Sequence, residues 1–226
     1  CALIENLLRR QNLARLIVLQ RNNSTQFNDP RVTIVNFDAE DAASIATAAQ
    51  TVQEAVSRVH LMINTVGMLH TDGQQPEKRL KDFDPANLQR SFAINAALLP
   101  ALVKAFGGLL RHPEPALVAS LSARVGSIED NDLGGWYSYR ASKAAHNMLL
   151  RTIAHEWRVS HRNAVIVALH PGTVHSPLSQ PFISSGYKNT VHTPADCAEH
   201  LLGVLSNLTG EASGGFYDWK GDTIPW

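Results

Sequence analysis

Short, continuously apolar runs alternate with segments of helical periodicity, and this alternation limits the fold more than any other feature of the sequence. The runs predict strands over residues 15–20, 32–37, 60–65, 116–121, 164–169 and 216–219. Helices are expected over 2–10, 42–58, 85–106 and 139–157, and from 194 onward, with a polar loop over 22–30. Strands that are apolar on both faces need helices on both sides, so the pattern predicts an α/β domain with a Rossmann-like, doubly wound parallel sheet.

Two of the expected helices begin with recognisable capping sequences. Asp84 followed by Pro85, and Thr193 followed by Pro194 and Asp196, are typical of helix N-termini, because the cap side chain accepts from free backbone N–H groups. Pro100 lies inside the expected helix over 85–106 and predicts a local distortion there.

The composition favours one domain spanning residues 1–226 and argues against several kinds of partner. With 226 residues, 44% of them hydrophobic, the chain can bury a sizeable core. Lys and Arg together number 20, as do Asp and Glu, so no net field favours nucleic acid or an anionic membrane. No apolar run is expected to reach the length of a membrane span, about 20 residues. Two cysteines, Cys1 and Cys197, are too few for a disulfide framework, which favours the cytoplasm.

Tyr139 and Lys143 are the first candidate pair for chemistry. A helix places residues four apart on the same face, so both side chains project in one direction. A fixed ammonium within a few ångströms favours the phenolate, and we expect Lys143 to lower the pKa of Tyr139 from its usual value of about 10. Tyr139 could then act as a general acid or base on a carbonyl or alcohol. Taken alone, such a pair is more often a half-buried tyrosine beside a solvated lysine.

Polar or small residues follow most of the expected strands, at the edge where parallel sheets bind ligands. They are Arg21, Asp38, 64–67, Ser122 and 170–173. Each one can be explained by turn chemistry, but their recurrence at successive strand ends, beside the helix of Tyr139, indicates a site for a flat ligand.

The order and spacing of these motifs resemble the short-chain dehydrogenase/reductase family over nearly the whole chain. The segment 64–67 (Asn-Thr-Val-Gly) is similar to the family's Asn-Asn-Ala-Gly, Tyr139 and Lys143 match its Tyr-x-x-x-Lys, and Pro171-Gly172 matches its Pro-Gly turn. Asn95 matches the fourth member of the catalytic tetrad, and Ser122 stands in the serine region. The segments 122–128, 134–140 and 224–226 look most like the C-factor or sniffer-type carbonyl reductases.

The resemblance implies a role for each member of the tetrad. Tyr139 would give a proton to the carbonyl oxygen while hydride arrives from a nicotinamide, and Lys143 would hold the ribose hydroxyls of that cofactor. Ser122 would orient and polarise the substrate oxygen. Asn95 would distort its helix and hold a water that links Lys143 to solvent.

The resemblance also implies a dinucleotide site and a cofactor preference. NAD enzymes usually carry a carboxylate after the second strand, whereas this chain has Arg21, so NADP(H) is favoured over NAD(H). Asp38 would accept from the adenine, and Val174 and Ser176 would contact the carboxamide. The full set of expected cofactor-binding residues is Arg21, Asp38, Asn64, Val66, Gly67, Tyr139, Lys143, Pro171, Gly172, Val174 and Ser176.

Two departures from the family pattern stand out. The chain starts inside the helix that should follow the family's first strand and Gly-rich phosphate loop, so we expect both to precede Cys1 in a longer sequence. The family also has a serine three residues before the glycine at Gly126, where this chain has Ala123. The serines that remain as candidates to polarise the substrate are Ser122, Ser120 and Ser127.

Several alternatives and details stay open at this point. A non-catalytic, dinucleotide-binding signalling protein on the same fold is the competing hypothesis. No metal centre is expected, because His155-Glu156 lacks a second histidine at helical spacing. The segment Pro177–Lys188, with Phe182 among its aromatic residues, is expected to cover an uncharged carbonyl substrate. By resemblance, the protein is expected to form a homodimer or homotetramer.

Overall fold

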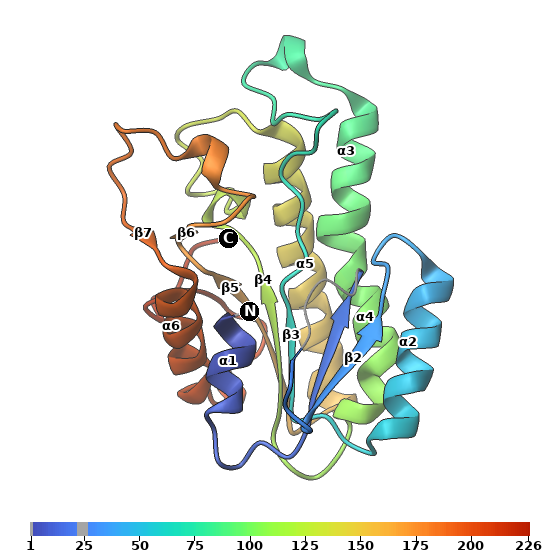
Figure 1. The fold of residues 1–226 in the computed structure, drawn as a ribbon. Coiled ribbons are helices and arrows are strands. Elements are labelled where there is room, and N and C mark those ends of the chain that lie inside the picture. The colour runs from blue at the N-terminus through green and yellow to red at the C-terminus, as the bar shows by residue number, and fades with distance from the viewer. Residues whose placement is uncertain (1, 22–26) are drawn as a thin grey trace.

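The computed structural model describes residues 2–21 and 27–226, and most of the expected helices and strands are present with small shifts at their ends (Figure 1). Part of the polar loop expected over 22–30 lies outside the described residues. The principal helices are α1 (Ala2–Leu8), α2 (Ala42–Ala55), α3 (Pro85–Phe92), α4 (Leu98–Leu110), α5 (Tyr137–Ser160) and α6 (Pro194–Ser206). The principal strands are β1 (Leu16–Gln20), β2 (Val32–Asn36), β3 (Leu61–Asn64), β4 (Ala116–Leu121), β5 (Ala164–His170) and β8 (Phe216–Asp218).

All of these strands run parallel to their neighbours, as expected, but they form two separate groups. β1 pairs with β2, and the second group has the order β3-β4-β5-β8. Among the described residues no ladder joins the two groups, so the sheet is interrupted between β1 and β3. This is the place where the family resemblance puts the first strand.

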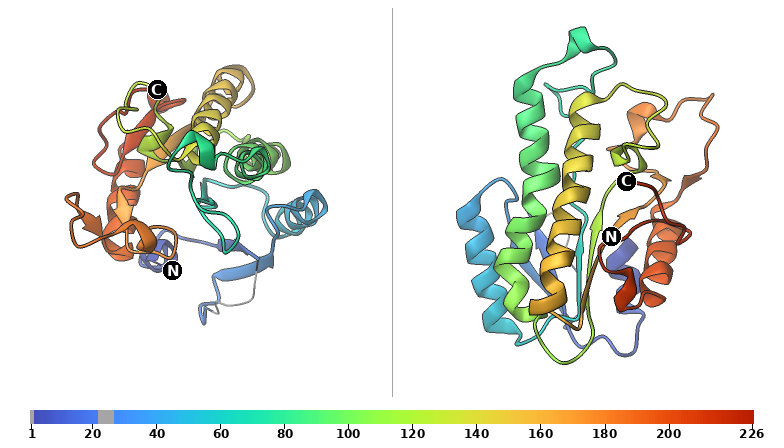
Figure 2. Two further views of the ribbon diagram at one scale, coloured as in Figure 1. Left: turned by 90° about the horizontal axis from the view of Figure 1, so that it is seen from above. Right: turned by 180° about the vertical axis from the view of Figure 1, so that it is seen from behind.

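Helices cover both faces of the sheet, which explains why its strands are apolar throughout. α2, α4 and α5 lie on one side, and α1 and α6 lie on the other (Figure 2). Along β4, Val118 packs in the cluster with α5, whereas its neighbour Ala119 packs in the cluster with α6. Side chains alternate between the faces of a strand, so both faces of β4 are buried.

The expected capping signals are used at the starts of α3 and α6. Asp84 accepts from the backbone N–H of Ala86, with Pro85 in the first turn, and Thr193 accepts from the N–H of Asp196. Each cap satisfies a donor that has no partner within its own helix. Two further short parallel strands, β6 (Thr173–Val174) and β7 (Val191–His192), were not expected from the sequence.

The distortion expected at Pro100 occurs one turn earlier, as a π-helix over η2 (Ala93–Ala97) between α3 and α4. Proline lacks the N–H that would continue the α-helical ladder, and a π-turn upstream relaxes that conflict. Asn95 lies in the middle of this π-turn. A distorted helix at Asn95 is the geometry that the resemblance implied.

The continuous helical run Pro85–Leu110 combines length with high apolarity. It is long and apolar enough, by length and composition, to cross a membrane. In the fold, 61% of its most apolar window is buried, with Leu98, Leu99 and Leu110 among the most enclosed side chains. Its apolarity is therefore accounted for by packing between the sheet and α5.

Candidate functional site

Tyr139 lies in the first turns of α5, enclosed by aromatic side chains. Its ring packs edge-to-face against that of Trp136, with 6.1 Å between the ring centroids. Trp136 packs in the same way against Phe182, with 5.0 Å between the centroids. Phe182 comes from the segment expected to cover the substrate, and it contacts Trp136, which in turn contacts Tyr139. Burial disfavours the phenolate and raises the pKa of Tyr139 to about 12.

Lys143 lies one turn further along α5 and is also buried, with 3% of its surface exposed. Its ammonium donates to the carbonyl oxygen of Leu121 at the end of β4, at 2.9 Å, and lies 5.9 Å from the centre of the Tyr139 ring. Removal from water lowers the pKa of Lys143 to about 8. The expectation that Lys143 lowers the pKa of Tyr139 was wrong for this structure, because desolvation of the phenol dominates.

Asn95 ties the loop after β3 to the start of α5. Its side-chain oxygen accepts from the N–H of Met68 at 2.7 Å, and its amide nitrogen donates to the Met68 carbonyl and to the Ser142 hydroxyl. The Ser142 hydroxyl donates in turn to the carbonyl of Tyr139. Asn95 is therefore linked to the backbone of Tyr139 through the Ser142 hydroxyl, in a buried network.

His146 is a member of this network that sequence analysis missed. Its Nδ1 donates to the backbone carbonyl of Asn95 at 3.0 Å, and its side chain is 1% exposed. Burial, reinforced by the charge of Lys143, lowers its pKa to about 3, so the imidazole is neutral. A histidine three positions after Lys143 is the only sequence signal, and it is indistinguishable from an ordinary core residue.

Glu77 is a second residue missed by sequence analysis, and it caps the helix that carries Tyr139. Its buried carboxylate accepts from both the backbone N–H and the hydroxyl of Ser138, although the two residues are 61 positions apart. The Glu77 carbonyl also accepts from the N–H of Trp136. A carboxylate at a helix N-terminus satisfies free donors and complements the helix dipole, so Glu77 holds the first turn of α5 in place.

The three candidate serines are all buried, and each hydroxyl contacts another protein group. Ser122 donates to the side-chain oxygen of Asn147 at 2.7 Å. Ser120 accepts from Asn64 at 3.0 Å, and Ser127 accepts from the N–H of Asp130 at 3.1 Å. The structure therefore brings Ser122 close to α5, but its proton is directed at Asn147.

The strand ends expected to hold a dinucleotide do meet at one edge of the structure. Arg21 follows β1 and is exposed, and Asp38 comes shortly after β2, where its carboxylate accepts from the N–H of Glu40. Asn64 shapes the turn after β3 by accepting from the N–H of Val66 at 3.1 Å. A side chain in place of Gly67 would extend toward the Lys143 ammonium, at 3.5 Å. Backbone at Gly67 thus borders Lys143 and Asn95 directly, which fits a cofactor lying across these strand ends.

The turn after β5 also has the expected form. Gly172 has a φ of +72°, and any side chain there would meet His192 and Trp219 within about 3 Å, so only glycine fits. The carbonyl of Pro171 accepts from the thiol of Cys197. Val174 lies in β6, and Ser176 follows it, with its hydroxyl paired to that of Ser179.

Comparison with known proteins agrees with this arrangement. Residues 7–185 match the family model described as short chain dehydrogenase. The chain is 30% identical over 216 residues to the 1-hydroxy-2-glutathionyl-2-methyl-3-butene dehydrogenase of Rhodococcus sp. (strain AD45), covering 90% of this chain and 92% of that protein. It is 37% identical over 155 residues to the C-signal protein of Myxococcus xanthus, covering 65% of this chain and 83% of the relative.

Solved structures give the same result. The NADPH-bound carbonyl reductase from chicken fatty liver superposes with a TM-score of 0.87 at 27% identity, covering 100% of this chain and 93% of the other. The Sniffer carbonyl reductase of D. melanogaster, at 20% identity and a TM-score of 0.87 over 100% and 93% of the two chains, shares the fold. The chain therefore belongs to the short-chain dehydrogenase/reductase family of oxidoreductases.

Proposed function

We propose that this protein reduces a carbonyl compound, or oxidises the corresponding alcohol, with NADP(H), and that Tyr139 exchanges the proton. The observation that carries the proposal is the enclosed group formed by Tyr139, Lys143 and Asn95, with the backbone of Gly67 against it. Buried ionisable side chains are costly to the fold, and they gather where chemistry needs them.

NADP(H) is proposed as the cofactor because the residue after β1 is the cation Arg21. An NAD enzyme usually has a carboxylate at this position. Arg21 is exposed at that position and would pair with the 2′-phosphate of the ribose. The similarity to an NADPH-bound carbonyl reductase supports this choice. Asp38, Asn64, Val66, Pro171, Val174 and Ser176 are proposed to line the same dinucleotide, on the strand-end positions described above.

When bound, the nicotinamide would supply hydride to the carbonyl carbon. Tyr139, whose pKa is raised to about 12, is protonated at neutral pH, so it holds the proton that the carbonyl oxygen would accept. Lys143 would hold the ribose hydroxyls and place a positive charge beside the oxygen that becomes negative. Asn95 would hold the helix of Tyr139 and the loop at Gly67 in fixed positions relative to each other, through its hydrogen bonds to Ser142 and Met68.

Ser122 is proposed to polarise the substrate oxygen, which requires a rearrangement of its hydrogen bond. If the Asn147 amide is rotated, its nitrogen donates to Ser122, and the serine proton becomes free for a substrate. In the assigned orientation that Asn147 nitrogen is buried with no partner among the described residues, so the rotation also removes an unsatisfied donor.

The substrate is proposed to be an uncharged carbonyl compound, because Trp136 and Phe182 make an apolar wall beside Tyr139. NADPH oxidation should be measured with a panel of aldehydes, ketones and quinones. Tyr139→Phe should lower turnover by about 10²–10⁴-fold, the usual contribution of a positioned general acid. Tyr137→Phe, an exposed neighbour on the same helix, is the matched control. Equal rates in the wild type and Tyr139→Phe contradict the proposal.

A non-catalytic, dinucleotide-binding signalling protein is the second candidate. Two observations favour it: the Ser122 hydroxyl is directed at Asn147, and Ala123 stands where the family has serine. The similarity to the C-signal protein points the same way. This candidate requires NADPH binding, measured by fluorescence titration, without turnover of any member of the panel.

A further inference from the structure

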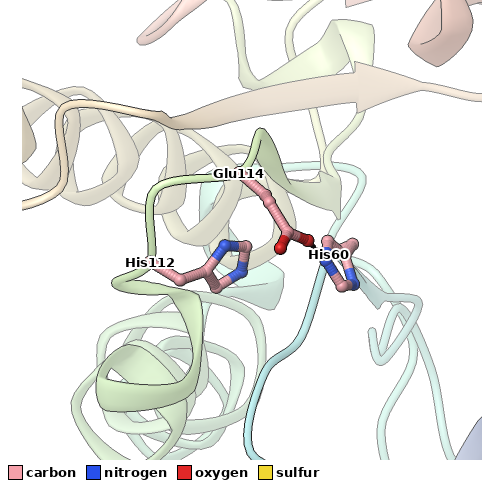
Figure 3. Close-up of side chains that lie close together, drawn as sticks. All are labelled: His60, His112 and Glu114. Atoms are coloured by element: carbon pink, nitrogen blue, oxygen red, sulfur yellow. Dashed lines mark hydrogen bonds and ion pairs between the residues drawn. The ribbon is translucent and has the colours of Figure 1, made fainter.

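Two histidines and a glutamate meet at the opposite end of the sheet from Tyr139. His60 directly precedes β3, and His112 and Glu114 lie in the loop between α4 and β4. One ring nitrogen of each histidine and one oxygen of Glu114 all lie within 4.8 Å of one another, and Figure 3 shows the carboxylate between the two rings. The active-site residues follow the carboxyl ends of the strands, so this group is separate from the catalytic site.

The protonation of His112 leaves one of its nitrogens free to bind a metal. Its Nε2 lies 3.0 Å from the carbonyl oxygen of Val59, and a carbonyl can only accept, so Nε2 carries the hydrogen. Nδ1 then carries no hydrogen and keeps its lone pair. It is buried and has no hydrogen-bond partner in the described part of the chain. Metal-binding histidines typically show this pattern, with one ring N–H donated to a backbone carbonyl.

Glu114 divides its two oxygens between different neighbours. Oε1 pairs with the guanidinium of Arg58, and Oε2 lies 2.6 Å from Nε2 of His60. These two contacts hold the carboxylate between the segment before β3 and the loop before β4. A metal at the Oε2 side would replace the proton between Glu114 and His60, while Arg58 continues to orient the carboxylate through Oε1.

Both segments of the cluster are held by backbone hydrogen bonds. The carbonyl of His60 accepts from the N–H of Leu117, and the N–H of Val59 donates to the carbonyl of Leu109. On the other segment, the Asn163 amide donates to the carbonyl of His112 at 3.3 Å. The side chains of His60 and Glu114 are about half exposed and free to adjust, while their backbones are fixed.

We propose that His60, His112 and Glu114 form a binding site for Zn²⁺, with Nε2 of His60, Nδ1 of His112 and Oε2 of Glu114 as ligands and a water in the fourth position. Two imidazoles and a carboxylate suit Zn²⁺, which takes nitrogen and oxygen ligands at about 2.0–2.2 Å in a tetrahedron. Tetrahedral ligands at that radius are about 3.3 Å apart, closer than the 4.8 Å within which the three groups lie, so the half-exposed side chains of His60 and Glu114 would have to turn toward His112. The metal would join the start of β3 to the loop before β4.

The sequence did not predict this site because its ligands are not spaced along one helix. His60 is 54 positions from Glu114, and the two are brought together only by the parallel pairing of β3 and β4. The expectation of no metal centre rested on helical spacing at His155 alone.

Isothermal titration of the metal-stripped protein with Zn²⁺ tests the proposal, with Mg²⁺ titrated in parallel. We expect one Zn²⁺ per chain and no comparable uptake of Mg²⁺, which prefers oxygen ligands. His60→Ala and Glu114→Gln should each weaken Zn²⁺ binding at least about tenfold. His155→Ala, which removes an exposed histidine elsewhere, should leave the affinity unchanged.

Thermal unfolding gives a second, independent measurement. At Zn²⁺ about one hundredfold above the dissociation constant, the midpoint should rise by roughly 5 °C or more in the wild type. The rise should be lost in both His60→Ala and Glu114→Gln. Less than one Zn²⁺ per chain in the wild type, or the same affinity and the same thermal shift in His60→Ala, overturns the proposal.

Discussion

Replacing Lys143 with methionine should stabilise the cofactor-free protein at neutral pH, although it removes a residue proposed to be essential for turnover. The ammonium of Lys143 is buried, with 3% of its surface exposed, and it donates a hydrogen bond to the carbonyl of Leu121. Burial lowers its pKa from 10.5 to about 8, because the charged form is separated from water. Methionine has a similar length and no charge, so it can occupy the same space.

The size of the effect follows from the pKa. At about 1.4 kcal/mol per pKa unit, keeping Lys143 charged at pH 7 costs the folded state about 3 kcal/mol. Losing the hydrogen bond to Leu121 offsets about 1 kcal/mol of the gain. Lys143→Met should therefore raise the free energy of unfolding by about 2 kcal/mol at pH 7.

This difference should depend on pH in a defined direction. Between pH 8 and 10.5 the unfolded chain binds the Lys143 proton and the folded chain does not, so the wild type gains stability as pH rises through that window. The advantage of Lys143→Met should accordingly shrink toward pH 10. Urea unfolding followed by tryptophan fluorescence at pH 7 and pH 10 measures both values.

Lys104→Met serves as the control for this experiment, because Lys104 is exposed on α4 and should show no such difference at either pH. The reasoning is refuted if Lys143→Met is less stable than the wild type at pH 7. It is equally refuted if the difference between the two proteins is the same at pH 7 and pH 10.

Three further predictions concern the proposed active site. Arg21→Glu should weaken NADPH binding about tenfold or more and change NADH binding far less, as measured by fluorescence titration; equal losses for both cofactors would argue against a 2′-phosphate contact. Glu77→Ala should lower the free energy of unfolding by about 2 kcal/mol, because Ser138 loses both of its bonds at the start of α5, and it should lower kcat for carbonyl reduction; unchanged unfolding in urea would show that the cap contributes nothing. Ser122→Ala should lower kcat about 10²-fold with little change in KM for NADPH, whereas Ser127→Ala should not; similar rates in both variants would remove Ser122 as the polarising group.

Local patterns were sufficient to predict the fold and the pair on α5. The apolar runs required strands covered on both faces, and β4 indeed buries Val118 on one side and Ala119 on the other. The capping residues Asp84 and Thr193 marked helix starts correctly. Such features depend on residues within one or two turns of each other, so they can be read along the chain.

The charge states and the hydrogen-bond partners of the site residues could not be predicted from local sequence patterns. Lys143 was expected to acidify Tyr139, but the phenol is so enclosed that desolvation raises its pKa to about 12. Burial is a property of the assembled layers, and it involves Trp136 and Phe182 from separate segments. No local pattern reports how much water a side chain loses on folding.

The sequence by itself determined the order of helices and strands, the shared face of Tyr139 and Lys143, and the edge of the sheet where polar residues collect. Only the tertiary structure decided that Glu77 caps α5 and that His60 meets Glu114. The physical reason is the distance along the chain. Periodicity and capping act over a few residues, whereas these contacts join segments more than 50 positions apart, and the register of a parallel sheet sets which side chains meet.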